Sequence, residues 1–213
     1  MLKILYEDNH IIVAFKPRGI LSQADGSKKE DMLTLLKDYI KEKYNKPGNV
    51  YLGLVHRLDI NTEGVMVFAR TSKAAARLSD SIAKHEFQKR YYAIVEGEFK
   101  DKNLQTLIHY IYKDEKQKKS MIKEDGQKAI LDFIPVESFK IDGALVTKVD
   151  ILLKTGRFHQ IRCQMSAIGH PLYGDKKYGS KYHIENEEFP LTAYSLSFPH
   201  PISHEMMTFT LED

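Results

Sequence analysis

The sequence contains a single cysteine, no long apolar run and no segment with the layout of a signal peptide. Because Cys163 has no thiol partner, an internal disulfide bond is excluded and a cysteine-ligated zinc site is disfavoured. No apolar run approaches the roughly 18 residues that a membrane-spanning helix requires. The first residues, Met-Leu-Lys-Ile-Leu-Tyr-Glu-Asp, do not resemble a secretory signal. We therefore expect a cytoplasmic protein without a membrane segment.

Internal repeats, low-complexity stretches and Gly/Ser-rich linkers are also absent. Of the 213 residues, 42% are hydrophobic and 29% charged, which is ordinary for a folded protein with a sizeable core. This composition excludes a disordered or collagen-like chain. The sequence predicts a single domain over residues 1–213, which we expect to be monomeric and to need no obligate protein partner.

The net charge of +3 is too small to identify a nucleic-acid-binding protein, but its distribution is uneven. Residues 70–128 hold 14 Lys and Arg against 9 Asp and Glu, whereas residues 181–213 hold 1 against 6. A molecule with a basic flank and an acidic end can steer a polyanion onto one face. A solvated lysine-rich surface explains the same pattern, so charge alone leaves both interpretations open.

Hydrophobic spacing predicts helices over residues 32–44, 72–85 and 157–168, the first with Asp31 as its N-cap. The lysine-rich segment from Lys113 to Lys119 indicates an exposed hairpin or loop. Strands dominate and the helices do not alternate with them regularly, so we expect an α+β fold with a mixed, mainly antiparallel sheet. The predicted strands cover residues 2–6, 10–15, 51–55, 65–68, 91–99, 104–112, 129–136, 145–153, 193–198 and 206–211.

Residues 54–69 place a carboxylate and a guanidinium between two apolar segments. Arg57 and Asp59 precede a polar turn that ends at Gly64. An element of this kind can hold an acid at a strand end, where a cleft often forms. The simpler interpretation is a turn aspartate that accepts backbone hydrogen bonds, next to a surface arginine.

Residues 153–165 concentrate strong hydrogen-bonding side chains in about one turn of the third predicted helix. On a helix, His159 and Arg162 stand at i and i+3 and share a face. An amphipathic helix with one hydrated side explains this pattern as well. The segment from Gly169 to Gly179 is rich in glycine and tyrosine, which indicates a loop.

Four segments, taken together and in this order, resemble the RluA family of pseudouridine synthases. The similarity extends over nearly the whole chain, from the Lys16–Pro17 region to His200. It implies that the chain isomerises a specific uridine to pseudouridine in ribosomal RNA, transfer RNA or both, without a metal or cofactor. The four segments are His56–Asp59 with Thr62 and Gly64, Lys89–Gly97, Gly156–Arg162, and Gly169–Asp175 with Tyr178 and Gly179.

The chain departs from the family pattern at two points. Glu63 stands before the turn glycine, where the family usually has serine. The chain also opens directly with strands of the catalytic domain, so we expect no S4-like RNA-binding domain. The catalytic domain would then bind the RNA by itself.

The resemblance assigns the reaction to three residues. The reaction detaches uracil from ribose, rotates it and rejoins it through a ring carbon, and the Asp59 carboxylate would be the reacting group. An ordinary aspartate pKa of about 3.9 keeps it ionised at neutral pH, and Arg162 would clasp it and oppose any rise of that pKa. Tyr91 would place its ring against the flipped uracil. Without the resemblance, Tyr91 is simply a core tyrosine on a strand, with Tyr92 on the opposite face.

Further residues would contact the RNA substrate. The target uridine must leave its stack to reach an enclosed carboxylate, and the resemblance suggests Arg57 as the wedge that fills the gap. A plain phosphate contact is the alternative for Arg57. The candidate substrate-binding residues are His56, Arg57, Thr62, Arg157, His159 and Gln160, and the candidate RNA-backbone contacts are Lys73, Arg77, Lys84, Lys89 and Lys118.

Two other classes of protein compete with an isomerase. A non-enzymatic RNA-binding protein needs the basic face but not Asp59, and a metal-dependent hydrolase loses activity with a chelator. The nine histidines are dispersed and form no HxH or HExxH pattern, so we expect no metal site. His159 and Gln160 are then expected to orient a loop, and Cys163 to be a small buried residue.

Overall fold

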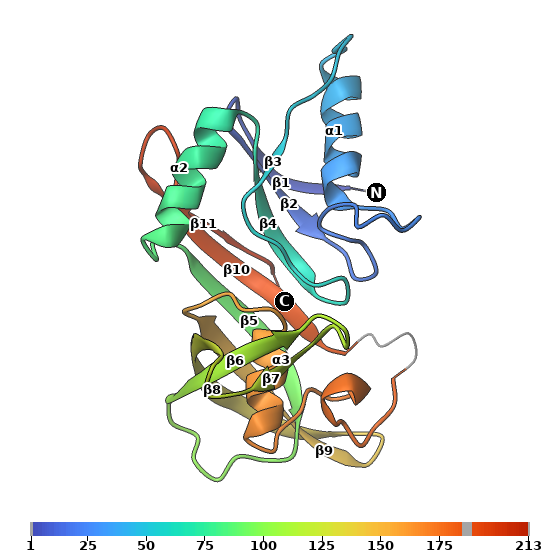
Figure 1. The fold of residues 1–213 in the computed structure, drawn as a ribbon, viewed down its shortest axis with the longest axis vertical. Coiled ribbons are helices and arrows are strands. Elements are labelled where there is room, and N and C mark those ends of the chain that lie inside the picture. Colours follow the sequence, from blue (N-terminus) through green and yellow to red (C-terminus); the bar gives the residue numbers. More distant parts are fainter. Residues whose placement is uncertain (1, 185–188, 213) are drawn as a thin grey trace. The chain divides into compact units, whose positions relative to one another are not determined.

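The computed structural model describes residues 2–184 and 189–212 and contains two compact units (Figure 1). The first unit comprises residues 1–88 and 193–213, and the second comprises residues 89–192. The single domain expected over residues 1–213 stays a prediction. Of the expected acidic end, residues 185, 187, 188 and 213 lie outside the described residues. No helix in the described part of the chain is long and apolar enough to cross a membrane.

The sheet of the first unit has the strand order β1–β2–β4–β10, with β3 beside β4 and β11 beside β10. The registers of β1 with β2, β2 with β4, β3 with β4, and β10 with β11 are antiparallel. The elements are β1 (Lys3–Glu7), β2 (Ile11–Lys16), α1 (Met32–Lys43), β3 (Gly53–Leu54), β4 (Glu63–Ala69), α2 (Ser72–Ala83), β10 (Leu191–Pro199) and β11 (Met206–Thr210).

Both helices of the first unit begin at a capped residue. The Asp31 Oδ1 accepts a hydrogen bond from the Thr34 amide at 3.0 Å, which confirms the predicted N-cap, and Thr71 caps α2 in the same way through the Ala74 amide at 3.1 Å. The two helices flank β2 and β4 on opposite sides (Figure 1). Each therefore covers one set of alternating strand residues.

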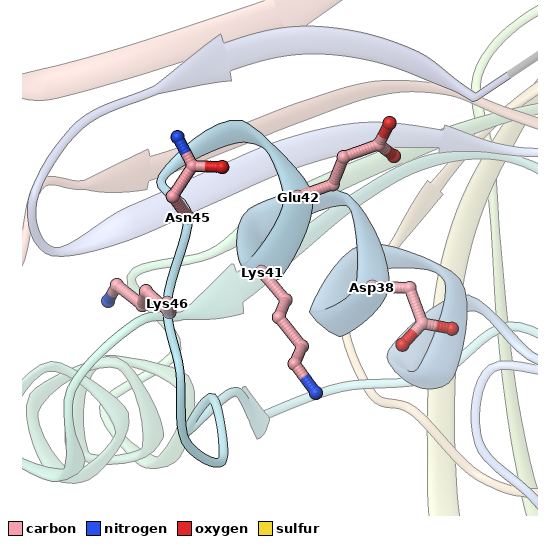
Figure 2. Close-up of a pocket in the computed structure, with 5 residues that line it drawn as sticks. All are labelled: Asp38, Lys41, Glu42, Asn45 and Lys46. Atoms are coloured by element: carbon pink, nitrogen blue, oxygen red, sulfur yellow. The ribbon is translucent and has the colours of Figure 1, made fainter.

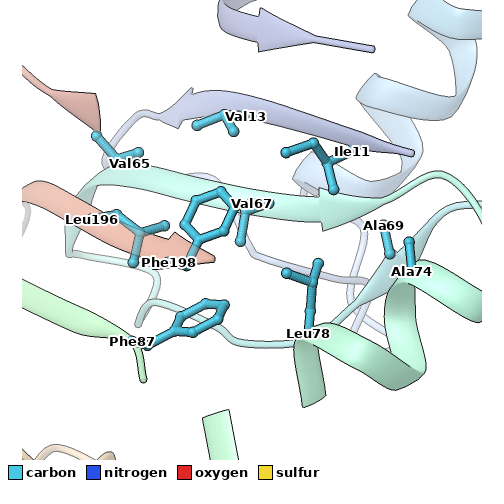
Figure 3. Packing of buried hydrophobic residues seen from close by; sticks show 10 residues of the cluster. All are labelled: Ile11, Val13, Val65, Val67, Ala69, Ala74, Leu78, Phe87, Leu196 and Phe198. Carbon is cyan, nitrogen blue, oxygen red and sulfur yellow. The ribbon is translucent and has the colours of Figure 1, made fainter. Parts of the chain in front are cut away.

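The core beneath α2 brings together residues that are far apart in the sequence (Figure 3). Leu78 of α2, Val67 of β4 and Phe198 of β10 are all fully buried. Phe87 stacks on Phe198 with a centroid separation of 5.3 Å. This packing fixes β4, and with it the chain segment that precedes β4.

The second unit contains the strand order β5–β9–β8–β6–β7, and every one of these neighbouring pairs is antiparallel. The predicted lysine-rich hairpin is confirmed, since residues 115–118 form the turn between β6 and β7. Together the two units confirm the predicted α+β class. The elements are β5 (Gln88–Glu96), β6 (Gln105–Asp114), β7 (Lys119–Ile122), β8 (Gln127–Ile141), β9 (Ala144–Leu153), α3 (Gln160–Ala167) and a 3-10 turn over Lys176–Tyr178.

Several sequence-based boundaries were wrong, since β5 ends at Glu96 instead of residue 99 and β8 extends to Ile141 instead of residue 136. Two further differences have a clear structural reason. The strand expected over residues 51–55 is only Gly53–Leu54, because just these two residues pair with β4. The third helix begins at Gln160 instead of residue 157, because His159 adopts a left-handed conformation with φ of 49°. A left-handed residue cannot continue an α-helix, so residues 157–159 form a turn before it.

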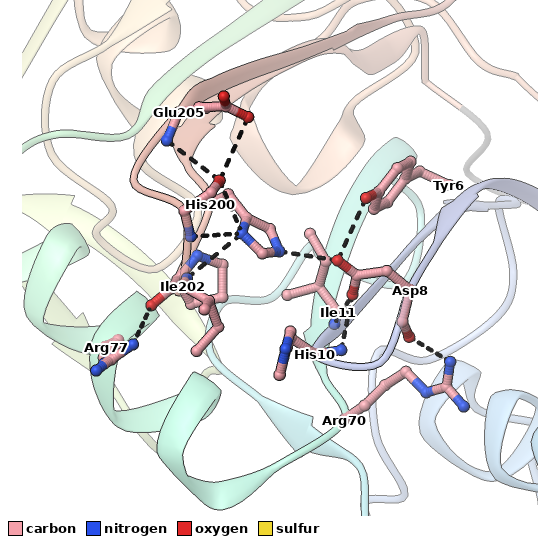
Figure 4. Close-up of polar contacts among 11 residues, drawn as sticks. Tyr6, Asp8, His10, Ile11, Arg70, Arg77, His200, Ile202 and Glu205 are labelled. Atoms are coloured by element: carbon pink, nitrogen blue, oxygen red, sulfur yellow. Dashed lines mark hydrogen bonds and ion pairs between the residues drawn. The ribbon is translucent and has the colours of Figure 1, made fainter.

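A polar cluster within the first unit ties the β1–β2 turn to the segment after β10 (Figure 4). The Asp8 carboxylate accepts hydrogen bonds from His200 Nε2 at 2.9 Å and from the amides of His10 and Ile11 at 2.7 and 2.8 Å. Burial alone would raise the pKa of Asp8, but these amide bonds and the His200 ring lower it below its ordinary value. The cluster joins residues 192 positions apart in sequence.

Asp8→Asn should lower the free energy of unfolding at pH 7 by about 1–2 kcal/mol. Because the pKa of Asp8 is lowered by folding, its stabilisation is complete above the unfolded value of about 3.9 and is lost as the pH falls through the folded value. Urea unfolding of both proteins should therefore give the same difference in stability at pH 7 and pH 5, and a smaller difference at pH 3, below the unfolded value. A difference that stays constant with pH would contradict this account, and the exposed Asp38→Asn variant serves as the control.

Candidate active site

Asp59 lies in the loop that joins β3 to β4, at the end of a segment held from two sides. The backbone of Leu58 is fixed by Ser22, whose hydroxyl donates to the Leu58 carbonyl at 2.8 Å and accepts from its amide at 3.1 Å. The Thr62 amide donates to the Asp59 carbonyl at 3.0 Å and closes the turn. The Asp59 side chain is half-buried, so this turn presents a carboxylate that retains access to solvent.

The turn ends at a glycine that no other residue can replace without strain. Gly64 has a φ of +140°, and a Cβ built on it would lie 2.3 Å from the Ala193 carbonyl oxygen of β10. A side chain is therefore excluded both by the backbone conformation and by the neighbouring strand. The loop after Asp59 runs directly against β10.

A fully buried lysine holds the inner side of this loop. The Lys16 ammonium donates to the carbonyls of Pro17, Ile60 and Thr62 at 2.9, 3.1 and 2.8 Å. Burial lowers the pKa of Lys16 to about 8, although the negative charges of Asp59 and Glu63 act in the opposite direction. Lys16 thus fixes the backbone on both sides of residue 61 and places a cation in the electrostatic environment of Asp59.

Sequence reasoning did not identify Lys16 as a functional residue. Its signal is a lysine at the end of an apolar strand, directly before Pro17, in the region where the family resemblance begins. The structure also gives the unusual Glu63 a partner, because Arg18 Nη2 lies 2.8 Å from its carboxylate. An ion pair from the same segment as Lys16 therefore occupies the position where serine is usual.

The other predicted residues of the Asp59 segment differ in their exposure. Arg57 is exposed, as a wedge or a phosphate contact requires. His56 is half-buried and its Nε2 accepts a hydrogen bond from the Val67 amide at 3.0 Å, while Thr62 is buried and its carbonyl binds Lys16. His56 also meets the Phe87 ring edge-on at a centroid separation of 6.2 Å.

Tyr91 belongs to β5 in the second unit, where its side chain is 7% exposed. It pairs with Ile151 of β9, and the alternating residues Ala93 and Val95 are buried on the same face. Tyr92 points to the opposite face, where its ring contacts the Lys148 ammonium at 4.3 Å. Asp59 comes from the first unit, and Tyr91 and Arg162 come from the second.

Arg162 is buried in α3 and its guanidinium is held by a carboxylate that sequence reasoning did not assign to it. Its Nε and Nη2 donate to the two Asp175 oxygens at 2.6 and 2.8 Å. This bidentate geometry fixes the plane of the guanidinium. Asp175 lies in the Gly169–Asp175 segment of the family resemblance, and this was the only sequence signal that could have pointed to it as a functional residue. The pairing of Arg162 with Asp59 stays a prediction.

His159 adjoins Arg162 as predicted, although it lies before the helix and not on it. Its Nε2 is 3.1 Å from Arg162 Nη1, and its Nδ1 is 2.9 Å from the Tyr178 hydroxyl. Burial, together with the positive charges of Arg162, Lys177 and Lys113, lowers the pKa of His159 to about 3. The ring is therefore neutral, and since Arg162 can only donate, we assign the proton to Nδ1.

Gln160 and Arg157 shape the same loop. The Gln160 side chain is buried, with its oxygen accepting from Thr155 Oγ1 and the Arg157 amide and its nitrogen donating to the Ile130 carbonyl. These bonds attach the 155–157 turn to β8. The expected role of Gln160 in orienting the loop near Asp59 stays a prediction. Arg157 is exposed and its Nε donates to the Lys128 carbonyl.

The five predicted backbone-binding cations are not equivalent. Lys73 and Lys118 are exposed, and Lys84 is exposed but paired with Asp80 at 2.7 Å. Arg77 donates to the Pro201 carbonyl at 2.8 Å. Lys89 is partly buried, and burial lowers its pKa. Lys73 and Lys118 are therefore the best placed of the five for phosphate contacts.

Neither a metal site nor a reactive thiol is found in the described residues. No group of three or more His, Cys, Asp or Glu side chains in this part of the chain could hold a metal ion. Cys163 is buried, as predicted, and burial raises its pKa to about 11. A cavity of about 500 Å³ at the end of α1 mixes lysines with carboxylates and has no aromatic lining residue (Figure 2). It offers no surface for stacking a base.

Comparisons with known proteins place the chain among RNA pseudouridine synthases. The sequence model of the RNA pseudouridylate synthase family matches residues 10–167. The chain is 32% identical to the dual-specificity RNA pseudouridine synthase RluA of Haemophilus influenzae, across 98% of this chain and 91% of that protein. It is 32% identical to the ribosomal large subunit pseudouridine synthase D of Zymomonas mobilis (99% and 69%). It is 30% identical to the tRNA pseudouridine synthase C of Vibrio cholerae (96% and 88%).

The fold is similar to that of a solved human protein, RNA pseudouridylate synthase domain containing 1. The TM-score is 0.78 at 24% identity, with 100% of this chain and 84% of that chain covered. The matched segment contains Asp59, Tyr91 and Arg162, and the full-length identities extend beyond it on both sides. The chain therefore belongs to the RNA pseudouridylate synthase family, as its resemblance to the RluA enzymes predicted.

Proposed function

We propose that this protein is an RNA pseudouridine synthase in which the Asp59 carboxylate reacts with a flipped-out uridine. The observation that carries the proposal is the Asp59 turn, which lies in the family-matched segment and is fixed from within by Lys16. A carboxylate on a rigid, half-exposed turn is suited to meet a substrate atom in a fixed position. An RNA-binding protein without catalytic activity has no need of this arrangement.

The reaction rearranges bonds without changing the oxidation state of the substrate. The N-glycosidic bond breaks, the uracil rotates and a carbon–carbon bond forms to ribose. The hydrogen on that ring carbon leaves as a proton, and the ring nitrogen freed from ribose gains one. An ionised carboxylate can attack or stabilise the electron-poor intermediate. Tyr91 is proposed to support the detached ring and to lie within reach of the proton transfer.

Arg162 is proposed to position and stabilise the Asp59 charge. Its bidentate bond to Asp175 and the neutral His159 next to it support a fixed guanidinium orientation. The exposed Arg57 is proposed as the side chain that fills the gap left by the extruded uridine, at a stage where unstacking costs a few kcal/mol. Lys73 and Lys118 are proposed to contact the RNA backbone.

The substrate class is proposed to be ribosomal RNA, transfer RNA or both. The names of the relatives support both classes, since one acts on the large ribosomal subunit and another on tRNA. We also propose that the chain acts in the cytoplasm as a monomer without an obligate protein partner. The lone, buried Cys163 is compatible with a reducing compartment.

Asp59→Asn should reduce pseudouridine formation by more than about 10³-fold, because the amide has no charge with which to react. The measurement is mass spectrometric mapping of ribosomal and transfer RNA from cells that lack the gene, complemented with either protein. The wild type should restore a missing pseudouridine and Asp59→Asn should not. Restoration by Asp59→Asn would refute the proposal, and the exposed Asp38→Asn variant controls for an unspecific loss of charge.

Tyr91→Phe should bind RNA with nearly unchanged affinity but turn it over slowly, by about 10²-fold or more, because only the hydroxyl is removed. Tyr92→Phe makes the same change on the other face of β5 and is the matched control. Single-turnover rates at saturating RNA separate the two. Equal rates for Tyr91→Phe and the wild type would remove Tyr91 from the mechanism.

Lys16→Met should lower kcat by about 10- to 100-fold with a smaller effect on RNA binding, because the Asp59 turn loses its internal donor. The pKa of Lys16 is lowered to about 8, so the ammonium loses its charge as the pH rises through that value. The wild-type kcat should therefore fall above about pH 8, and the Lys16→Met profile should lack this decline. Lys41→Met, at an exposed lysine, is the control and should behave as the wild type. If kcat of Lys16→Met depended on pH as that of the wild type does, the role assigned to Lys16 would be wrong.

A further inference from the structure

One face of β6 presents apolar and aromatic side chains that none of the helices in the described residues covers. Ile108, Tyr110 and Tyr112 alternate along the strand and are 55%, 47% and 42% exposed. The residues between them point the other way, where Ile111 packs with Cys163 of α3 and Tyr178. The tyrosines thus lie on the face of the sheet opposite α3.

Cations flank both tyrosines. Lys128 of β8 stands directly opposite Tyr110 in the antiparallel register. The Lys123 ammonium lies over one face of the Tyr112 ring, 4.6 Å from its centroid, so a base stacked on Tyr112 takes the other face or displaces this ammonium. The surface formed by Tyr110, Tyr112, Lys123 and Lys128 is called the tyrosine platform below. Glu124 and Asp125 follow Lys123 in the next turn and moderate its positive charge.

This chemistry fits single-stranded RNA better than a protein partner. Residues at i and i+2 on a strand are about 6.8 Å apart on one face, so two rings can each stack a base of an unpaired strand. The lysines then lie within reach of the phosphates between those bases. The buried centres of protein interfaces are depleted in charged residues, and lysine in particular, so lysines flanking both rings disfavour a protein occupant.

Basic side chains lead from the platform around the sheet edge to the Arg162 region. The β6–β7 hairpin places Lys113 4.9 Å from the Phe158 ring and Lys119 5.1 Å from the Tyr178 ring, on the α3 side of the sheet. Arg157 Nε donates to the Lys128 carbonyl, which places a further cation beside β8. A strand of RNA can follow these charges from one face to the other.

We propose that the tyrosine platform binds an unpaired segment of the substrate RNA by stacking two bases on Tyr110 and Tyr112, with Lys123 and Lys128 on the phosphates. This inference rests on the proposed function, because it takes RNA as the substrate. It adds a binding surface on the sheet face that does not carry Tyr91.

The test measures equilibrium binding of a fluorescein-labelled oligouridylate of about 12 nucleotides to the full chain carrying Asp59→Asn, so that no reaction follows binding. Adding Tyr110→Leu with Tyr112→Leu should weaken binding by at least about tenfold, because stacking is lost while apolar area is retained. Tyr110→Phe with Tyr112→Phe should bind within about twofold of the parent. Tyr51→Leu, at a tyrosine of similar exposure in the first unit, should do the same.

The cations have a separate signature. Lys123→Gln with Lys128→Gln should reduce the slope of log affinity against log salt by about 1.4, the value for two phosphate contacts on a single strand. Thermal unfolding checks that each variant is folded, and sedimentation records its oligomeric state.

Three outcomes would overturn the platform: the leucine pair binds within twofold of the parent, Tyr51→Leu loses as much affinity as the pair, or the pair changes only the oligomeric state. Failure of the proposed function has a different readout, because the wild-type chain would then form no pseudouridine in the RNA mapping experiment. The oligouridylate affinities decide the platform in either case.

Discussion

The structure of the candidate site depends on one buried ammonium group. Lys16 has no solvent exposure, and three backbone carbonyls replace the water that it has lost. Removing a charge from water is costly unless it is fully bonded, so the loop around residues 60–62 must keep the conformation that supplies those carbonyls. The same constraint fixes the turn that carries Asp59. The carboxylate proposed to react is thus positioned by a residue more than 40 positions earlier in the chain.

The second unit uses a similar device around Arg162. Asp175 holds the guanidinium through two bonds, and the neutral His159 lies against its remaining nitrogen. His159 links this pair to Tyr178, whose burial raises its pKa to about 12, so the phenol also stays uncharged. Because His159 and Tyr178 are both neutral, neither places a further charge against the ion pair of Arg162 and Asp175. The orientation of Arg162 is therefore a property of the whole network.

Glu63 illustrates how a family site tolerates a changed residue. A carboxylate replaces the usual serine, and Arg18 supplies a cation at 2.8 Å. Both partners are partly exposed, so the pair itself adds little stability, but it keeps a second negative charge near Asp59 compensated. Since Lys16, Arg18 and Glu63 lie in two segments that pair as neighbouring strands or adjoin them, the substitution is accommodated locally.

The sequence by itself determined those features of the fold that depend only on residues close together in the chain. Helical spacing with a capping Asp31, alternating strands and the lysine-rich turn were predicted because capping and periodicity act over a few positions. The order of four motifs determined the family and singled out Asp59, Tyr91 and Arg162. Only the tertiary structure decided that Lys16 is buried under the Asp59 turn and that Asp175 holds Arg162. It also decided that His159 is left-handed and that β6 leaves two tyrosines uncovered. Each of these depends on which distant segment supplies a carbonyl, a carboxylate or a covering side chain, and no local pattern records that.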